Sequence, residues 1–158
     1  MASFKIPLRP SVDFSPAGAM ALLREDRLPM GSNIISGMRI SHPVIHIPDC
    51  LRVYEGVAID GEAKNTLQSI GDYFIVHGDC DLSFCVNLRS IGAHLTVDGS
   101  LNVTGAEQIA FGHGCSVNGD IYISKDMKKY LPSDFMVVGK IICCDPAQKY
   151  NGLILLSK

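Results

Sequence analysis

The sequence predicts a mainly β protein, namely a parallel β-solenoid of about five or six coils of roughly twenty residues, preceded by a short capping helix. Three observations predict this fold. One pattern recurs four times at a nearly constant spacing, apolar and polar residues alternate within each copy, and a helix-like segment precedes the copies. Strict alternation is the periodicity of a strand that buries one face.

The repeated pattern reads V-x-G-x-h-x-h, where h is mostly apolar, and its copies are 21, 20 and 20 residues apart. A constant period near twenty indicates that each copy forms one coil resting on the last. Equivalent side chains would then form ladders along a dry interior. The copies are VHGDCDL from Val76, VDGSLNV from Val97, VNGDIYI from Val117 and VVGKIIC from Val137.

The glycine of each copy falls at an inward position, which predicts a corner where the chain bends toward the axis or adopts a positive φ. A second glycine or proline precedes each strand, and two weaker copies extend the pattern toward the N-terminus. The preceding positions are Gly71, Gly92, Gly112 and Pro132, and the weaker copies contain Gly37 and Gly56.

The segment SPAGAMALLRE predicts the capping helix, with Ser15 as N-cap and Pro16 in the first turn. A helix here would cover the open end of the stack. We therefore expect a single domain made of a cap (residues 1–33), solenoid repeats (34–145) and a C-terminal capping or dimer strand (146–158).

The stretch NLRSIGAHLTVDGSLNVTG, from Asn87, resembles the leucine-rich-repeat-like solenoids of bacteria and their phages, and is also similar to receptor L-type repeats. Those repeats follow approximately L-x-S-[IL]-[GP]-x-x-L-x-V-x-G-x-L-x-L. The resemblance covers residues 65–145 and implies a right-handed parallel solenoid that holds a protein partner. It implies no chemistry, because one scaffold serves many functions.

Two alternatives remain open. Apolar residues also recur every six positions from Ile91, as in the left-handed eighteen-residue coils of hexapeptide-type acyltransferases, which use a histidine in a cleft between subunits. That phase breaks between Leu88 and Ile91 and leaves the glycines unexplained. The V-x-G-x-I phrases are also similar to those of self-polymerising β-helical cytoskeletal proteins.

The composition narrows the function classes. A net charge of −2 gives no reason to expect nucleic acid or a membrane surface as a partner, and neither a signal peptide nor a run of eighteen apolar residues is present. The six cysteines form no C-x-x-C pair, which argues against a zinc site and a disulfide scaffold. We expect reduced thiols in the cytoplasm, or in a host cell after delivery, and no metal or cofactor.

No residue is predicted to be catalytic. The histidines are expected on exposed turns or outward strand positions, since no spacing makes them converge on a metal. They are His42, His46, His77, His94 and His113.

The alternation of inward and outward positions also predicts which cysteine side chains are buried. Cys80, Cys115 and Cys143 fall on inward ladders and should be buried, whereas Cys144 faces outward and should be the more reactive of the C-terminal pair.

The outward strand positions carry a polar, mildly acidic set of side chains. This surface could bind a basic peptide or a calcium ion, or it could simply be the solvated face of a half-buried sheet. The candidate binding residues are His77, Asp79, Asp81, Asp98, Asn118, Asp120 and Tyr122.

The last copy and the C-terminal tail GLILLSK are apolar on both faces, which predicts a covered patch. The cover is either the tail itself or the same patch of a second subunit across a two-fold axis. The candidate self-association residues are Met136, Val138, Ile142, Leu153 and Leu155. Together these features predict a non-enzymatic protein-interaction module with an unidentified protein partner, from a bacterium or a phage or acting as a delivered effector.

Overall fold

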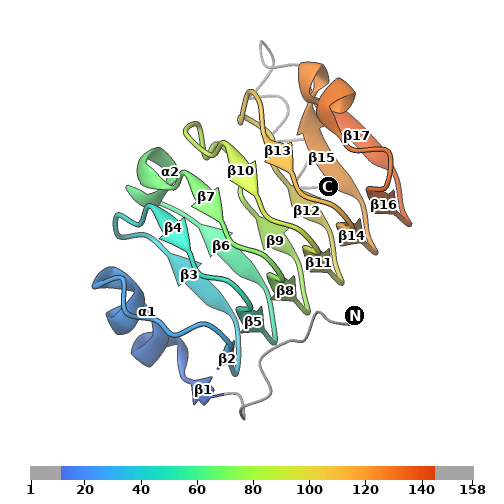
Figure 1. Ribbon diagram of the computed structural model, residues 1–158. Helices are drawn as coiled ribbons and strands as arrows, with labels where there is room; N and C mark the ends of the chain where they lie inside the picture. The colour runs from blue at the N-terminus through green and yellow to red at the C-terminus, as the bar shows by residue number, and fades with distance from the viewer. Residues whose placement is uncertain (1–11, 145–158) are drawn as a thin grey trace.

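The computed structural model describes residues 12–144. These residues form three parallel sheets of seven, six and four short strands, with few helices (Figure 1). Each repeat adds up to three strands, at most one to each sheet, as β8 (Ile75–Val76), β9 (Cys80–Asp81) and β10 (Ser90–Ile91) illustrate. We call the strands added by one repeat a layer. Residues paired between layers are 19 apart at the closest, for Ile34 and Val53, and 23 apart at the widest, for Val53 and Val76.

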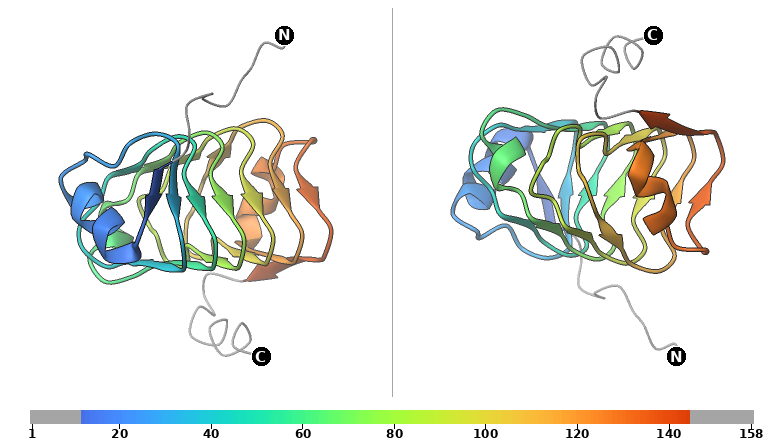
Figure 2. Two further views of the ribbon diagram at one scale, coloured as in Figure 1. Left: turned by 90° about the horizontal axis from the view of Figure 1, so that it is seen from below. Right: turned by 90° about the horizontal axis from the view of Figure 1, so that it is seen from above.

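The seven-stranded sheet runs the length of the stack (Figure 2). Its order is β1-β2-β5-β8-β11-β14-β16, and every pair is parallel. The strands are β1 (Val12–Phe14), β2 (Ser32–Ile34), β5 (Arg52–Val53), β8 (Ile75–Val76), β11 (Thr96–Val97), β14 (Ser116–Val117) and β16 (Met136–Val137).

The six-stranded and four-stranded sheets form the other sides of the stack (Figures 1 and 2). The six-stranded sheet contains β3 (Met38–Ile40), β6 (Val57–Ile59), β9 (Cys80–Asp81), β12 (Leu101–Asn102), β15 (Ile121–Ser124) and β17 (Ile141–Cys144). The four-stranded sheet contains β4 (His46–Ile47), β7 (Ser69–Ile70), β10 (Ser90–Ile91) and β13 (Ala110–Phe111).

The predicted ladders are confirmed. Val76 pairs with Val97, Val97 with Val117 and Val117 with Val137, and the first three side chains are fully buried. The next predicted ladder, Cys80, Leu101, Ile121 and Ile141, is also paired in register. Burial of one such aliphatic side chain stabilises the fold by about 1.5–3 kcal/mol, so the stacked interior supplies the main driving force.

The observed pairing follows the twenty-residue period and not the six-residue one. An eighteen-residue coil would set Val97 beside Cys115, whereas Val97 is paired with Val117. The right-handed winding, the number of coils and the division at residues 33 and 145 stay predictions.

The predicted capping helix is present as α1 (Pro16–Arg24), which lies at the N-terminal end of the stack (Figure 2). The Ser15 hydroxyl accepts a hydrogen bond from the Gly18 amide at 3.1 Å, which satisfies one of the unpaired amides of the first turn. Ala19 and Leu23 are buried in the core.

Two further helical turns were not predicted, namely α2 (Ala63–Thr66) and the 3₁₀ helix η1 (Lys125–Tyr130). The η1 turn lies between β15 and β16, where earlier layers have a strand of the four-stranded sheet. Met127 fills the interior at this level, fully buried, and its sulfur accepts a hydrogen bond from the Ile109 amide at 3.3 Å.

The corner glycines are needed for space and not for a positive φ. A Cβ on Gly99 would lie 2.2 Å from Asp79 Oδ1 and 2.9 Å from the Asp79 amide nitrogen, and Gly99 is not among the residues with positive φ. The backbone of one corner therefore rests directly on the corner of the preceding layer.

Apart from Asp26 and Gly31, which follow α1, positive φ occurs at two other turns of the repeats, and the sequence analysis did not predict either. Equivalent residues of successive layers share it, with φ between 49° and 96°. One set, before the strands of the seven-stranded sheet, is Cys50, Tyr73, His94 and Gly114, and the other, after the six-stranded sheet, is Gly61, Phe84 and Gly105.

We expect Gly99→Ala to destabilise the protein by about 1–3 kcal/mol, since the added methyl group must push apart two backbone corners. Gly18→Ala is the control, because a Cβ there has Ser15 Oγ at 3.3 Å as its nearest neighbour and alanine favours the helix. Urea unfolding of both variants measures the difference. Equal stability of Gly99→Ala and the parent chain would contradict the close stacking of the corners.

Candidate interaction surface

One row of exposed side chains follows the strands of the seven-stranded sheet. Each member comes directly after a residue that is paired in register, so the row crosses six successive layers at the strand spacing of about 4.8 Å. We call this row the corner ridge, and its members are Ile35, Tyr54, His77, Asp98, Asn118 and Val138.

The centre of the corner ridge is linked by side-chain contacts. His77 Nδ1 lies 2.8 Å from Asp98 Oδ2, and Asn118 Nδ2 donates to Asp98 Oδ1 at 3.4 Å. The ring of Tyr54 stacks on His77 from the other side, with centroids 5.1 Å apart and planes 22° from parallel. Four side chains from four repeats are therefore held in one line, although all of them remain accessible to solvent.

Two of the predicted binding residues, Asp79 and Asp120, bind the backbone of the next layer. Asp79 Oδ1 accepts from the Ser100 amide at 2.9 Å, and Asp120 Oδ1 accepts from the Lys140 amide at 2.8 Å. Between them, Ser100 Oγ accepts from the Asp120 amide at 3.1 Å. The residue after the corner glycine therefore ties each corner to the next, a role that the sequence analysis did not assign.

The same device recurs at the corner before the seven-stranded sheet. Asp49 Oδ1 accepts from the Asp72 amide at 2.8 Å, and Asp72 Oδ1 accepts from the Ala93 amide at 2.8 Å. A signal for both rows exists in the sequence, since a short oxygen-bearing side chain stands next to many of the repeated glycines.

Asp81 and Tyr122 lie on the outer face of the six-stranded sheet, on either side of Asn102 in register. Asp81 Oδ1 also accepts from the Ser83 amide at 2.9 Å, as Asn102 Oδ1 does from Thr104 at 3.0 Å. The seven candidate residues thus surround one corner of the stack and do not share one flat face.

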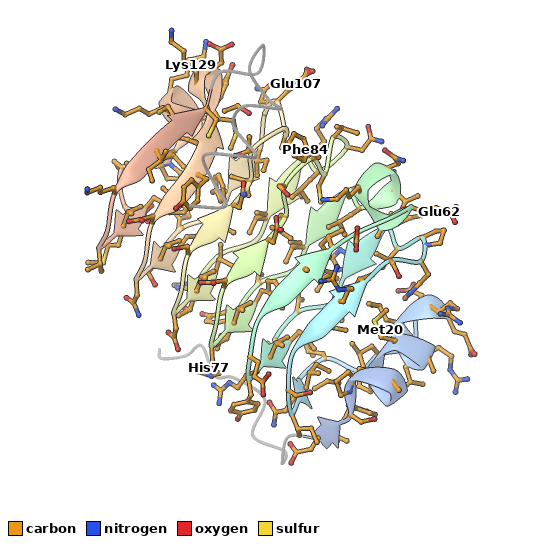
Figure 3. All side chains as sticks on the ribbon, turned by 180° about the vertical axis from the view of Figure 1, so that it is seen from behind. Met20, Glu62, His77, Phe84, Glu107 and Lys129 are labelled. Atoms are coloured by element: carbon orange, nitrogen blue, oxygen red, sulfur yellow. The ribbon has the colours of Figure 1, made fainter. Side chains whose placement is uncertain are left out.

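A groove of about 560 Å³ opens beside this corner, between α1 and the outer face of β3 and β6, the face seen in Figure 3. Its floor is shallow because Gly37, Gly56 and Ala58 present almost no side chain, and Asp79 lies at its rim. Met20 of α1 lines the opposite wall.

The expectation of exposed histidines is confirmed for four of the five. The His113 side chain is 92% exposed and lies 3.6 Å from Asp134, and His94 is exposed and stacks on Tyr73 with centroids 4.6 Å apart. His46 is also exposed, with its Nδ1 2.7 Å from Ser69 Oγ. His77 belongs to the corner ridge.

The expectation for His42 is wrong. His42 is half-buried, and neither ring nitrogen reaches solvent or finds a hydrogen-bond partner among the described residues. Burial, followed by the positive charge of Arg24, lowers the pKa of His42 below its ordinary value near 6.5 and so favours the uncharged ring. The expectation failed because His42 precedes β4, so strand alternation does not apply to it.

All six cysteines are free thiols. Cys80 and Cys115 are buried as predicted, and burial raises the pKa of both. The expectation for the C-terminal pair is wrong, because Cys143 is exposed and Cys144 is buried. Both cysteines belong to β17, the last described strand of its sheet. Cys144 is paired with the buried Ser124, and the Thr104 hydroxyl points at its sulfur from 3.9 Å, whereas Cys143 is paired with Ile123 and has no further described strand above it.

The candidate self-association residues are only partly described. The side chains of Met136 and Val138 are 65% and 71% exposed, and Ile142 is half-buried. Leu153 and Leu155 lie outside the described residues.

Across residues 12–144, no three His, Cys, Asp or Glu side chains gather closely enough to hold a metal ion. In the same range, no helix has the length and apolar character needed to cross a bilayer. Comparison with known proteins finds no match to a family model, to a curated protein or to a solved structure.

We expect Asp79→Ala to lower stability by about 1 kcal/mol, because the Ser100 amide loses its acceptor. Asp98→Ala is the matched control and should cost less than about 0.5 kcal/mol, since its contacts are exposed. Urea denaturation of the two variants gives both values. A reversed order would mean that Asp98, and not Asp79, supports the corner.

Thiol labelling tests the burial of the C-terminal pair. We expect N-ethylmaleimide at pH 8 to modify Cys143 in the native protein within minutes, while Cys144 reacts only after unfolding. Cys85 is an internal control, because burial raises its pKa to about 11 and leaves roughly one thiol in a thousand ionised at that pH. Peptide mass spectrometry locates the label, and modification of Cys144 before Cys143 would contradict the structure.

Proposed function

We propose that the protein is a non-enzymatic protein-interaction module whose contact surface is the corner ridge together with Asp81 and Tyr122. The observation that carries this proposal is the line of accessible side chains from Tyr54 through His77 and Asp98 to Asn118, one from each of four repeats. A rigid row of this kind presents contacts in a fixed order with little further loss of side-chain entropy on binding.

The chemistry of the ridge suggests the kind of partner. Tyr54 is 43% exposed and Ile35 is 56% exposed, so both offer apolar contact to a partner. Tyrosine is also enriched at protein interfaces. Asp98, which contacts His77 one layer beyond Tyr54, and Asp81, on the six-stranded sheet, are both exposed and add negative charge to the surface. We infer a partner protein that sets a basic side chain against Asp98 and apolar side chains against Tyr54 and Ile35.

The groove beside α1 offers a further contact site next to the corner ridge. It adjoins Asp79 and has a floor made of glycine and alanine, so a single side chain of the partner could enter it while the ridge is occupied. Buried anchors of this sort often carry most of the binding energy at an interface.

The two alternative functions receive less support. An acyltransferase of the hexapeptide type needs eighteen-residue coils and a histidine in a cleft, whereas neighbouring central strands pair 20 or 21 residues apart and four of the five histidines are exposed. A self-polymerising protein needs two open ends, and α1 stands at one of them.

The resemblance to bacterial and phage repeats supports further proposals. It favours right-handed winding, which is also the usual hand of parallel crossover connections. It favours a bacterial or phage origin, including that of an effector delivered to a host cell, and a cytoplasmic place of action.

Affinity capture from an extract of the source cells tests the proposal. We expect Asp98→Lys to lower the affinity for the captured partner at least tenfold, because a basic group of the partner would then meet a positive charge. Glu107→Lys is the matched control with the same charge reversal, since Glu107 is exposed and lies in the next layer, at the opposite edge of the stack from His77 (Figure 3).

Titration calorimetry with the purified partner gives the affinities, and Tyr54→Ala should weaken binding by a similar factor. Equal affinity of the parent chain and the two ridge variants would refute the corner ridge as the contact surface. Equal weakening by Asp98→Lys and Glu107→Lys would show only a nonspecific charge effect.

A further inference from the structure

A polar pocket lies on the outer face of the four-stranded sheet, which is a different sheet from that of the corner ridge. Its volume is about 400 Å³, and it spans β7 and β10, which are neighbours in their sheet (Figure 1). Every lining side chain carries a hydrogen-bonding group, and none of them is a carboxylate. We call it the serine pocket, and its lining residues are Gln68, Ser69, Asn87, Arg89 and Ser90.

Two serine hydroxyls line this pocket in register. Ser69 and Ser90 are paired directly between β7 and β10, so their backbones lie at the strand spacing of about 4.8 Å. Each serine is followed by a buried isoleucine, and strand alternation therefore leaves both serine side chains on the outer face. Two O–H donors at this separation can bind different oxygens of one oxyanion. The next residue of the row is Ala110, so the hydroxyls are confined to two layers.

Arg89 supplies a positive charge that has no carboxylate partner. Its Nη1 donates to the carbonyls of Val86 and Leu88 at 2.9 and 3.4 Å, and these two bonds restrain the guanidinium. Among residues 12–144, no ion pair includes Arg89, and no hydrogen bond uses its Nε or Nη2. The N–H groups that remain can bind a carboxylate or a phosphate at two points.

The neighbouring polar groups can add donors. Asn87 Nδ2 donates one hydrogen to the Asn65 carbonyl at 2.6 Å and keeps a second one. His46 Nδ1 lies 2.7 Å from Ser69 Oγ. When this nitrogen carries the hydrogen, the ring donates to Ser69 and leaves the serine hydroxyl free to donate to a ligand. The pocket thus offers several donors and one positive charge to a single ligand group.

We propose that the serine pocket binds an oxyanion, namely a carboxylate or a phosphate group, between Arg89 and the hydroxyls of Ser69 and Ser90. The volume of the pocket lies in the range of small-molecule sites, so the ligand is a small organic acid or a phosphate ester. This inference is independent of the proposed function, because the pocket and the corner ridge belong to different sheets.

Titration of the full chain with inorganic phosphate and, separately, with acetate tests the proposal by chemical-shift mapping in NMR spectra. Sodium chloride at the same ionic strength is the reference, because it reproduces the general screening of charges. We expect saturable shifts at the amides of Ser69, Arg89 and Ser90 with at least one of the two anions. The anion that binds more tightly identifies phosphate or carboxylate as the recognised group. The absence of saturable shifts at these amides with both anions would overturn the proposal.

Three variants separate recognition in the pocket from a general charge effect. Arg89→Gln should weaken binding at least about tenfold, because it removes the charged two-point donor. Ser90→Ala should weaken it about fivefold or more through the loss of one donor to the anion. Ala110 of the same row shows that the fold accommodates alanine at this position.

Arg52→Gln is the matched control for Arg89→Gln, since it removes the same charge from β5 in the seven-stranded sheet. It should change the affinity by less than about twofold, because exposed charges at a distance are screened. Equal weakening by Arg89→Gln and Arg52→Gln would overturn the serine pocket as the binding site. Unchanged affinity of Arg89→Gln would do the same.

Discussion

The fold depends on a short distance between the backbones of successive corners. At Gly99 there is no room for a Cβ, because the Asp79 amide and carboxylate lie directly beneath it. The absence of a side chain lets the corner of each layer settle on the last, which brings the flanking strands to hydrogen-bonding distance. The Asp79 side chain then accepts the amide of the residue after the next glycine, so close approach and hydrogen bonding support each other.

This constraint explains which features the sequence could predict. A glycine every twenty residues and strict apolar alternation reveal the ladders of Val97 and Leu101, because both depend only on position within a repeat. The capping helix was predictable because Ser15 and Pro16 act through their immediate neighbours. The candidate binding residues could be located on one corner, but the separation of Asp79 from Asp98 could not be foreseen, since it depends on which amide lies nearest in the adjacent layer.

The failures have a different origin. Cys143 occupies an inward position yet is exposed, because alternation says where a side chain points and not whether another layer lies above it. His42 lies before its strand begins, outside the alternation on which the prediction was based. The positive φ of Tyr73, Phe84 and His94 was hidden because bulky residues occupy conformations usually associated with glycine or asparagine.

Strands pair only between adjacent layers, and this restriction affects how the protein responds to force and to proteases. Among the described strands, each is hydrogen-bonded only to strands of the layer before and the layer after it. Removing the outermost layer therefore leaves the pairing in the middle of the stack intact. Under force or proteolysis, such a chain can unfold from one end one layer at a time. Each step is opposed by the free energy of burying the apolar side chains of a single layer. Because α1 packs against the first layers through the buried Ala19 and Leu23, the first step at that end must also detach a helix.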